Sequence, residues 1–481
     1  MKTISLYNTL TRSKEELTTL EPGKVRLYTC GLTVYSQPHV GNWLGYIYWD
    51  VLVRTLQTSD YTVARTQNIT DVGHLTSDDD SGEDKMQKGA RAEGVTAWDI
   101  ARKYRQVAEH GAYDLLGLIR PNHLVPATEY IAQQIQFAQQ LESSGYTYII
   151  PGEGLYFDTS KLSDYGKLAR LDVGGLEAGA RVSVEGKRNI TDFAIWKLSP
   201  VDQQRDMEWD SPWGKGFPGW HLECSVIASE TLGDQIDIHT GGIDHIPVHH
   251  TNEIAQTEAV TGKTFSNFWL HNNHIKVDGT KISKSLGNVF TLQDLIDRGY
   301  DLDAFKLLAL AKHYRTEGNF TWEIMDAAAA RLKHWQNIAS LRWQVRDTLE
   351  DDDTKDESYK VNGKLLAAPH AMLEALRDDL NTPTALAVID EAFDAIDRVG
   401  DIRRIQFSAL LSLLQTIDQL LGLHLINTTP DITDDQKMLI LERERVRENR
   451  NWARSDEIRD QLAEQGIELK DASERTIWSR K

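Results

Sequence analysis

The chain has 481 residues, of which 40% are hydrophobic and 26% are charged, and this length predicts about three globular domains. Only two cysteines exclude a disulfide scaffold, no apolar run reaches the ~18 residues of a membrane span, and no secretory signal opens the chain, so we expect a cytoplasmic protein without membrane association. A net charge of −19 argues against a general nucleic-acid binder, although a local basic track could still hold RNA.

The first part of the chain alternates strand and helix patterns. Residues 24–31 are typical of a short buried strand, and residues 43–56 have the apolar spacing of a helix. A second strand follows at residues 61–71 and ends in a polar loop. This succession predicts a parallel α/β sheet, whose ligands bind at the carboxyl ends of its strands, where Cys30 and Thr70 fall.

The middle and end of the chain have different patterns. Residues 121–214 combine helical patterns with Gly-rich hairpin-like runs and are interpreted as an insertion, after which the sheet resumes near residues 234–242. From about Glu317 the pattern is almost entirely helical, with Asn381 as a candidate helix cap. One final helix is expected over residues 436–466.

The segment PHVGN, residues 38–42, lies between the first strand and the first helix. Gly41 removes a side chain where a ligand could approach the backbone, and a helix start offers unpaired N–H groups to a phosphate. His39 and Asn42 are three residues apart and could both face that phosphate. By itself, such a short motif is weak evidence.

The segment DGTKISKSLGN, residues 278–288, carries Lys281 and Lys284 on either side of Ser283. A Gly- and Ser-rich loop of this kind can close over a triphosphate, and its lysines can neutralise the charge that develops as pyrophosphate leaves. Taken alone, a solvated basic turn explains the segment better.

The second cysteine, Cys224, precedes a predicted helix on which His249 and Glu253 are four residues apart and share a face. Cysteine, histidine and glutamate are all zinc ligands in proteins, and Cys30 would complete a set of four. A single buried cysteine is usually a small hydrophobic side chain. Both cysteines lie beside ligand-type segments, which favours one metal site.

Together these segments resemble the class I aminoacyl-tRNA synthetase family, specifically its cysteinyl branch. PHVGN resembles the first class signature and KISKS the second, and further similar segments run nearly from end to end: YTCGLTVY, QNITD, DFAIWK, PGWHLECS, DIHTGGIDHIPVHHTNEIAQ and NWARSDEIRDQLAEQGIELKD. The resemblance implies an enzyme that activates L-cysteine with ATP to cysteinyl-adenylate and transfers it to the 3′ end of tRNA(Cys). It also implies one Zn²⁺ per chain, Mg²⁺ with ATP, and a monomer.

The resemblance implies roles for individual residues. The expected zinc ligands are Cys30, Cys224, His249 and Glu253. The expected cysteine-pocket residues are Thr70, Trp220 and Asp244, the last of which would pair with the substrate ammonium. The expected ATP-binding residues are His39, Gly41, Asn42, His239, Gly241, Lys281, Ser283 and Lys284, and four of them, His39, Asn42, Lys281 and Lys284, are expected to be catalytic. The expected anticodon-reading residues are Arg447, Asp456 and Asp471, for which a solvated helix face with local ion pairs is an equally good explanation.

The implied fold is a Rossmann-like parallel-sheet catalytic domain with an insertion, followed by an α-helical bundle and a small C-terminal anticodon-binding domain. The expected boundaries are 1–120 and 215–265 for the two halves of the catalytic domain, 121–214 for the connective insertion, 266–325 for a KISKS-containing stem-contact region, 326–425 for the helical bundle and 426–481 for the C-terminal domain.

The implied zinc would be a device for specificity. A thiolate is a much better zinc ligand than a serine hydroxyl or an alanine methyl group, and a metal favours the deprotonated thiol. Direct recognition of this group could give roughly 10⁴-fold discrimination without editing. The reaction needs no protein nucleophile, since positioning and charge stabilisation carry it.

One segment departs from the family pattern. The common form continues QNITD with Val-Asp-Asp-Lys, whereas this chain reads DVGHLTSDDDSGEDK, an apparent insertion whose acidic part runs from Asp78 to Asp84. Two alternative functions stay open. A ligase that joins cysteine to an amino sugar resembles the same catalytic half but lacks the C-terminal tail, and a non-catalytic RNA-binding paralogue is disfavoured by the intact signature residues.

Overall fold

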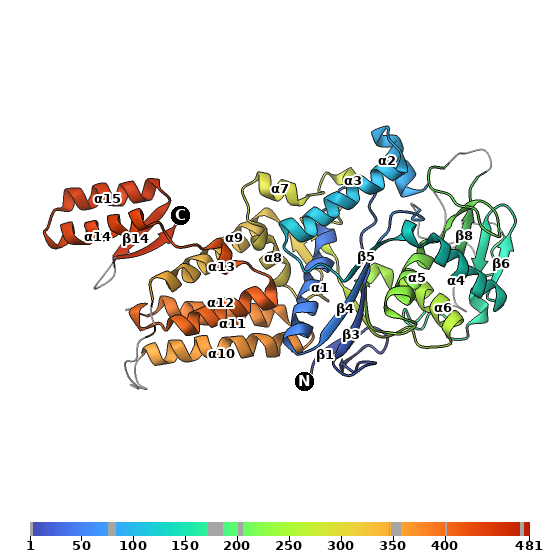
Figure 1. Ribbon diagram of the computed structural model, residues 1–481, viewed down its shortest axis with the longest axis horizontal. Coiled ribbons are helices and arrows are strands. Elements are labelled where there is room, and N and C mark those ends of the chain that lie inside the picture. Colours follow the sequence, from blue (N-terminus) through green and yellow to red (C-terminus); the bar gives the residue numbers. More distant parts are fainter. Residues whose placement is uncertain are drawn as a thin grey trace. The chain divides into compact units, whose positions relative to one another are not determined.

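The computed structural model describes residues 3–75, 83–171, 186–200, 205–345, 347, 357–399, 402–471 and 476–481. Its backbone contacts divide the chain into two compact units. The first consists of Met1–Gly299 with Tyr314–Phe320, and the second of Tyr300–His313 with Thr321–Lys481 (Figure 1). Among the described helices, none is both long enough and apolar enough to cross a membrane.

The centre of the first unit is a five-stranded sheet in which every neighbouring pair is parallel. Its strands, in spatial order, are β11 (Ser266–Asn272), β10 (Ile236–Gly242), β3 (Lys24–Thr29), β4 (Thr62–Ile69) and β5 (His123–Pro126). The predicted parallel α/β sheet is therefore confirmed, with β3 at its middle (Figure 1).

The described helices of this unit are α1 (Val40–Thr58), α2 (Lys85–Glu93), α3 (Ala97–Glu109), α4 (Ile131–Ser143), α5 (Trp220–Leu232), α6 (His249–Thr261) and α7 (Leu292–Asp297). Of these, α1 and α5 pack directly against the parallel sheet. Two small strand pairs complete the unit: β1 (Ser5–Asn8) with β2 (Ser13–Glu16), and β12 (Ile275–Val277) with β13 (Gly318–Phe320).

The insertion has a sheet of its own, but its limits differ from those expected. Antiparallel strands β6 (Thr147–Ile150), β7 (Gly154–Phe157), β8 (Phe193–Leu198) and β9 (Gly216–Pro218) form it. Strand β5 belongs to the parallel sheet although it lies inside 121–214, β9 belongs to the insertion although it follows 214, and β11 extends the parallel sheet beyond 265. These strands are three to seven residues long, too short for periodicity to assign them to one sheet.

The second unit is helical. Its helices are α8 (Leu302–Leu310), α9 (Trp322–Ser340), α10 (Glu357–Arg377), α11 (Thr382–Asp397), α12 (Phe407–Leu421), α13 (Leu425–Thr428), α14 (Asp434–Glu448) and α15 (Trp452–Glu464). The Asn381 side chain accepts a hydrogen bond from the Thr384 N–H at 3.2 Å, so the cap of α11 is as predicted. Helices α8 to α13 pack against one another, which matches the predicted helical bundle.

The expected single helix over 436–466 is wrong. The chain turns at Arg450, whose φ of 58° ends α14, and Asn451 caps α15 through its side chain. The two helices lie side by side, next to a hairpin of β14 (Ile467–Asp471) and β15 (Thr476–Arg480) (Figure 1). Folding back buries apolar residues of both helices in a separate small core: Ile440, Ile458, Leu462, Ile467 and Trp478.

Candidate metal centre and amino-acid pocket

A cavity of about 170 Å³ opens where strands β3 and β4 end. Its lining includes residues near the ends of both strands and near the starts of helices α2, α5 and α6: Cys30, Gly31, Thr33, Asn68, Thr70, His74, Lys85, Trp220, Cys224, Asp244, His245, Val248 and His249. Gly31 allows the two strand ends to approach, because a Cβ at this position would lie 1.7 Å from the carbonyl oxygen of Asn68. The carboxyl end of the sheet therefore holds the pocket, as the sequence predicted.

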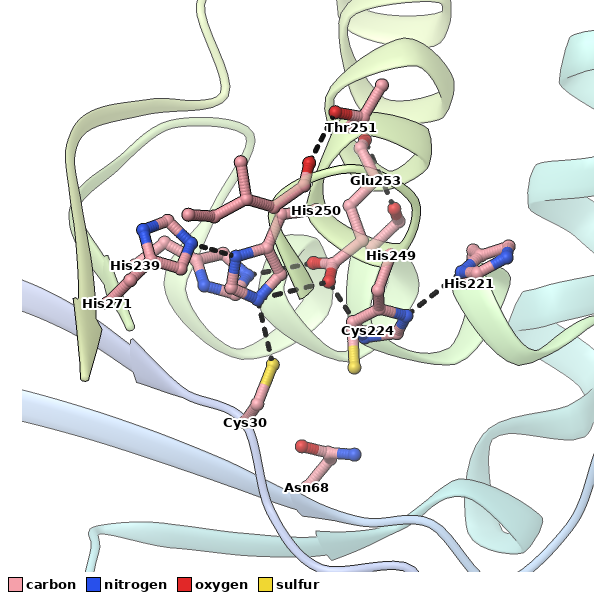
Figure 2. Close-up of polar contacts among 12 residues, drawn as sticks. Cys30, Asn68, His221, Cys224, His239, His249, His250, Thr251, Glu253 and His271 are labelled. Carbon is pink, nitrogen blue, oxygen red and sulfur yellow. Dashed lines mark hydrogen bonds and ion pairs between the residues drawn. The ribbon is translucent and has the colours of Figure 1, made fainter. Parts of the chain in front are cut away.

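Four side chains with metal-binding atoms meet at this cavity. One ligand atom from each of Cys30, Cys224, His249 and Glu253 lies within 4.8 Å of all the others. His249 and Glu253 are one turn apart on α6, Cys224 faces them from α5, and Cys30 follows β3 (Figure 2). The structure thus brings together all four side chains that the sequence singled out.

The environment of Glu253 shows that this set fits a cation. The carboxylate is fully buried; its Oε2 is 2.8 Å from His239 Nε2, and its Oε1 forms an ion pair with His249 Nε2 at 3.0 Å, although this oxygen accepts no well-aligned hydrogen bond among the described residues. Burial opposes its charge, but His239 and His249 outweigh burial and lower the pKa of Glu253 to about 2. Two sulfurs, an imidazole and a charged carboxylate are the donors that tetrahedral zinc sites use.

The two thiols differ in their protonation. Burial raises the pKa of both, but for Cys30 the hydrogen bond from Cys224 and the nearby His250 outweigh burial, and its pKa falls well below the usual range. For Cys224, burial and the adjacent Cys30 raise the pKa well above the usual range. Cys30 therefore releases its proton more readily than Cys224 does. A metal that displaced the proton of Cys224 would make both sulfurs anionic ligands.

Several histidines that the sequence interpretation did not single out hold these ligands in place. His221 Nδ1 lies 2.9 Å from His249 Nδ1, His250 Nε2 lies 3.3 Å from Cys30 Sγ, and His250 Nδ1 lies 2.8 Å from His271 Nε2 (Figure 2). Such partners orient metal ligands and fix their tautomers. His250 and His239 also form a second possible set with Cys30 and Glu253. The adjacent pair His249–His250 was the available signal in the sequence.

The three expected cysteine-pocket residues, Thr70, Trp220 and Asp244, all line the cavity. The Trp220 ring stacks on His249, with centroids 4.3 Å apart, and on His74, with centroids 4.1 Å apart. Thr70 Oγ1 donates to the buried Glu223, which the sequence interpretation missed. Burial raises the pKa of Glu223 well above its ordinary value, although Thr70 opposes this.

The first signature segment begins helix α1. The His39 Nδ1 accepts a hydrogen bond from the Gly41 N–H at 3.1 Å, and the Asn42 side chain accepts one from the His39 N–H at 2.9 Å. This reciprocal capping arrangement fixes both side chains at the helix start. A Cβ at Gly41 would lie 2.8 Å from Ile282 Cδ1, so glycine lets the two signature segments touch.

The second signature segment is an exposed turn. The Ser283 N–H donates to Asn288 Oδ1 at 2.8 Å, and Asn288 Nδ2 donates to the Lys281 carbonyl at 3.1 Å. Lys281 is exposed. The backbone of Lys284 begins a short helical turn, but its side chain lies outside the described part of the chain.

Two of the residues expected to bind ATP, His239 and Gly241, lie beside Glu253 and His250. His239 is fully buried in β10; it contacts Glu253 and stacks on Trp269 with centroids 4.5 Å apart. A Cβ at Gly241 would lie 2.6 Å from the His250 ring. The His239 side chain therefore faces Glu253 from inside the sheet, and its expected contact with ATP stays a prediction.

The expected anticodon residues are only partly brought together. Arg447, at the end of α14, forms an ion pair with Asp471, to which Arg443 donates two hydrogen bonds of 2.7 and 3.0 Å. Asp456 lies on α15, is exposed, and pairs with Arg459 at 3.2 Å. Of the acidic insertion from Asp78 to Asp84, residues 78–82 lie outside the described residues, whereas Asp84 caps helix α2.

Comparison with known protein families matches almost the whole chain. Residues 16–330 match the class I (C) tRNA synthetase catalytic domain, residues 371–425 match the DALR domain, and residues 429–478 match the cysteinyl-tRNA ligase anticodon binding domain.

Curated relatives are similar over their full lengths. The chain is 43% identical to cysteine–tRNA ligase 1 of Burkholderia lata, covering 98% of this chain and 96% of that one. It is 38% identical to cysteine–tRNA ligase of Treponema denticola, covering 99% of each.

Solved structures share the fold. Mycobacterium tuberculosis methionyl-tRNA synthetase with methionyl-adenylate aligns with a TM-score of 0.60 at 15% identity, over 83% of this chain and 92% of that one. A leucyl-tRNA synthetase ternary complex from Agrobacterium radiobacter aligns with a TM-score of 0.58 at 12% identity, over 87% and 88%.

Proposed function

The chain belongs to the cysteine–tRNA ligase family of class I aminoacyl-tRNA synthetases, and we propose that it recognises its amino acid through a zinc ion held by Cys30, Cys224, His249 and Glu253. The enzyme activates cysteine with ATP and transfers it to tRNA. The match to an anticodon binding domain at residues 429–478 disfavours the alternative ligase that joins cysteine to an amino sugar, since that enzyme lacks this tail.

The observation that carries the zinc proposal is the gathering of four ligand atoms within 4.8 Å of one another, three of them from residues that line a small cavity. When bound, the ion would supply a Lewis-acidic site for the substrate thiolate. Serine and alanine offer no sulfur to such a site. The ion would therefore select cysteine during binding and would not take part in the bond changes.

The remaining chemistry is positioning. The cysteine carboxylate attacks the α-phosphate of ATP and pyrophosphate leaves, after which a ribose hydroxyl at the tRNA 3′ end attacks the adenylate carbonyl. We propose that the start of α1, with Gly41, receives a phosphate through its backbone N–H groups. Lys281 and Lys284 would neutralise the negative charge that grows on the leaving pyrophosphate.

Asp244 is proposed to bind the ammonium group of the cysteine, and Thr70 and Trp220 to shape the cavity around it. Arg447, Asp456 and Asp471 are proposed to contact the anticodon, and residues 266–325 the acceptor stem. We further propose that the enzyme acts as a monomer with Mg²⁺ bound to ATP.

The test combines metal analysis with cysteine-dependent exchange of pyrophosphate into ATP, with serine in place of cysteine as the substrate control. The wild-type chain is expected to hold one zinc ion, and Cys224→Ser to lose both zinc and exchange. Glu230→Gln is the matched control, because Glu230 is an exposed residue on the same helix. Normal cysteine-dependent exchange by a zinc-free Cys224→Ser enzyme would contradict the proposal.

A further inference from the structure

The segment that departs from the family pattern starts and ends at the cavity. Leu75 and Asp84 form an antiparallel bridge, and the Lys85 N–H donates to the His74 carbonyl at 3.0 Å. The two ends of the segment are therefore joined by their backbones. As a result, His74 before the segment and Lys85 after it become neighbours, and both line the cavity.

The side chains of His74 and Lys85 form a connected series. His74 Nδ1 lies 2.7 Å from Thr33 Oγ1, and Lys85 Nζ lies 2.6 Å from His74 Nε2. An ammonium group can only donate, so Nε2 accepts from Lys85 and the proton of the neutral ring lies on Nδ1, directed at Thr33. His74 is 8% exposed, and its ring is held against Trp220 with an interplanar angle of 11°.

Lys85 is not placed to stabilise its own helix. It is the first residue of α2, where the helix dipole favours negative charge and disfavours lysine. Its neighbour Asp84 anchors this helix start, accepting hydrogen bonds from Met86 N–H and Gln87 N–H and an ion pair from Arg205 at 2.6 Å. The backbone of Lys85 is thus held firmly while its ammonium group is directed to the cavity wall.

A bound amino acid carries one positive and one negative group, and each needs a partner of opposite charge in the cavity. A cysteine with its sulfur at Cys30 and Cys224 carries its ammonium and carboxylate groups on the same carbon, so both must be bound within the same cavity of about 170 Å³. Asp244 offers a negative charge for the ammonium group. Among the described residues that line the cavity, Lys85 is the one lysine or arginine.

We propose that Lys85 binds the carboxylate of the substrate cysteine, and that His74 is a positioning residue that holds Lys85 and Trp220 in place. This inference rests on the proposed zinc site, which would fix the other end of the same molecule. Lys85 would orient the carboxylate, which is the group that attacks ATP. His74 links this charge, through the Trp220 ring, to the metal ligand His249.

The test compares L-cysteine with cysteamine, which keeps the thiol and the ammonium group but lacks the carboxylate. Both are measured as ligands of the zinc-loaded enzyme, cysteine directly and cysteamine as a competitor. For the wild type, cysteine is expected to bind about 10- to 100-fold more tightly than cysteamine, as a hydrogen-bonded charge pair allows. In Lys85→Met this preference is expected to disappear, since cysteine weakens and cysteamine does not.

Three controls separate this inference from a loss of structure. Lys85→Arg, which keeps the charge, should restore most of the preference for cysteine. Lys88→Met, an exposed position on the same helix, should leave both affinities unchanged. Zinc content should stay at the wild-type value in every variant, and failure of the wild type to bind zinc or cysteine would overturn the proposed zinc site itself.

The role of His74 is tested by His74→Phe, which keeps an aromatic ring against Trp220 but removes the acceptor for Lys85. Alone it should reduce the preference for cysteine about 3- to 10-fold, as loss of one hydrogen bond does. Combined with Lys85→Met it should cause no further reduction, because it acts through Lys85. Equal weakening of cysteine and cysteamine in Lys85→Met, or independent effects of the two substitutions, would overturn the proposal.

Discussion

Two buried carboxylates, one in each unit of the molecule, show how different surroundings produce the same acidity. Glu253 in the first unit and Asp303 in the second are almost inaccessible to water, and the pKa of each is lowered to about 2. In both, burial opposes the charge and neighbouring cationic or hydrogen-bonding groups outweigh burial.

The partners of the two carboxylates differ. Asp303 Oδ1 pairs with Lys306 at 2.8 Å and Oδ2 accepts from the His424 N–H at 2.9 Å, so both oxygens are used by the protein. Glu253 also uses both oxygens, Oε2 at 2.8 Å from His239 Nε2 and Oε1 at 3.0 Å from His249 Nε2, but its partners are themselves metal-binding side chains and two sulfurs lie beside them. A lowered pKa therefore does not identify a binding site by itself, whereas the grouping of a carboxylate with other metal-binding side chains supports the proposal of one.

The largest effect is expected for Glu253→Gln. This change keeps the shape of the side chain but removes the charge that a divalent ion needs, so zinc affinity and cysteine activation should fall by at least about 100-fold. Metal analysis after dialysis and pyrophosphate exchange measure the two losses. If Glu253→Gln kept its zinc and full pyrophosphate exchange, Glu253 would not be a metal ligand.

Asp303→Asn should lower stability and leave cysteine activation unchanged. A folded-state pKa near 2 against an ordinary value of 3.8 corresponds to about 2 kcal/mol of stability. Because the folded-state pKa is depressed, this contribution is present above pH 4 and is lost as the pH falls from about 4 to 2. Denaturant unfolding at several pH values measures it.

Asp394→Asn is the control for Asp303→Asn, since Asp394 is exposed and lies 3.9 Å from its partner Arg398. Its stability should change by less than about 0.5 kcal/mol at every pH. If Asp303→Asn instead reduced pyrophosphate exchange, Asp303 would contribute to cysteine activation as well as to stability.

The smallest effect is expected for Asp471→Asn. Unlike Glu253 and Asp303, the Asp471 carboxylate is half-exposed. Hydrogen bonds from Arg443, opposed by slight burial, and from Arg447 hold the pKa of Asp471 well below its usual range. If it contacts the anticodon, the substitution should lower kcat/KM for tRNA about 10-fold. Pyrophosphate exchange without tRNA should stay normal. A normal kcat/KM for tRNA would mean that Asp471 stabilises the fold and does not contact the anticodon.

Residues that follow simple geometric rules were predictable from the sequence. Cys30 and Thr70 were placed by the rule for parallel strand ends, and His249 and Glu253 by the four-residue spacing of a helix face. The meeting of Cys224 with Cys30 was favoured by their positions beside ligand-type segments and was then implied by the family resemblance, since no local pattern fixes a contact between residues almost two hundred positions apart.

Other features depended on tertiary packing. The break at Arg450 was missed because helical periodicity continues on both sides of it, and only the shared core of α14 and α15 requires the reversal. The buried position of His239 was missed for a similar reason, since a strand residue faces either side of a sheet according to register. Lys85 became visible only as part of the cavity wall, and Glu223 only through its hydrogen bond with Thr70.

The closed base of the segment between Leu75 and Asp84 has an evolutionary consequence. The backbone bonds at its base hold His74 and Lys85 at the cavity regardless of how many residues lie between them. Closing a longer flexible loop adds little cost, about 0.6 kcal/mol for each doubling of its length. Relatives can therefore lengthen, shorten or decorate this segment by insertion and deletion while the amino-acid pocket keeps its wall, which makes it a natural place for lineages to diverge and for a label to be inserted.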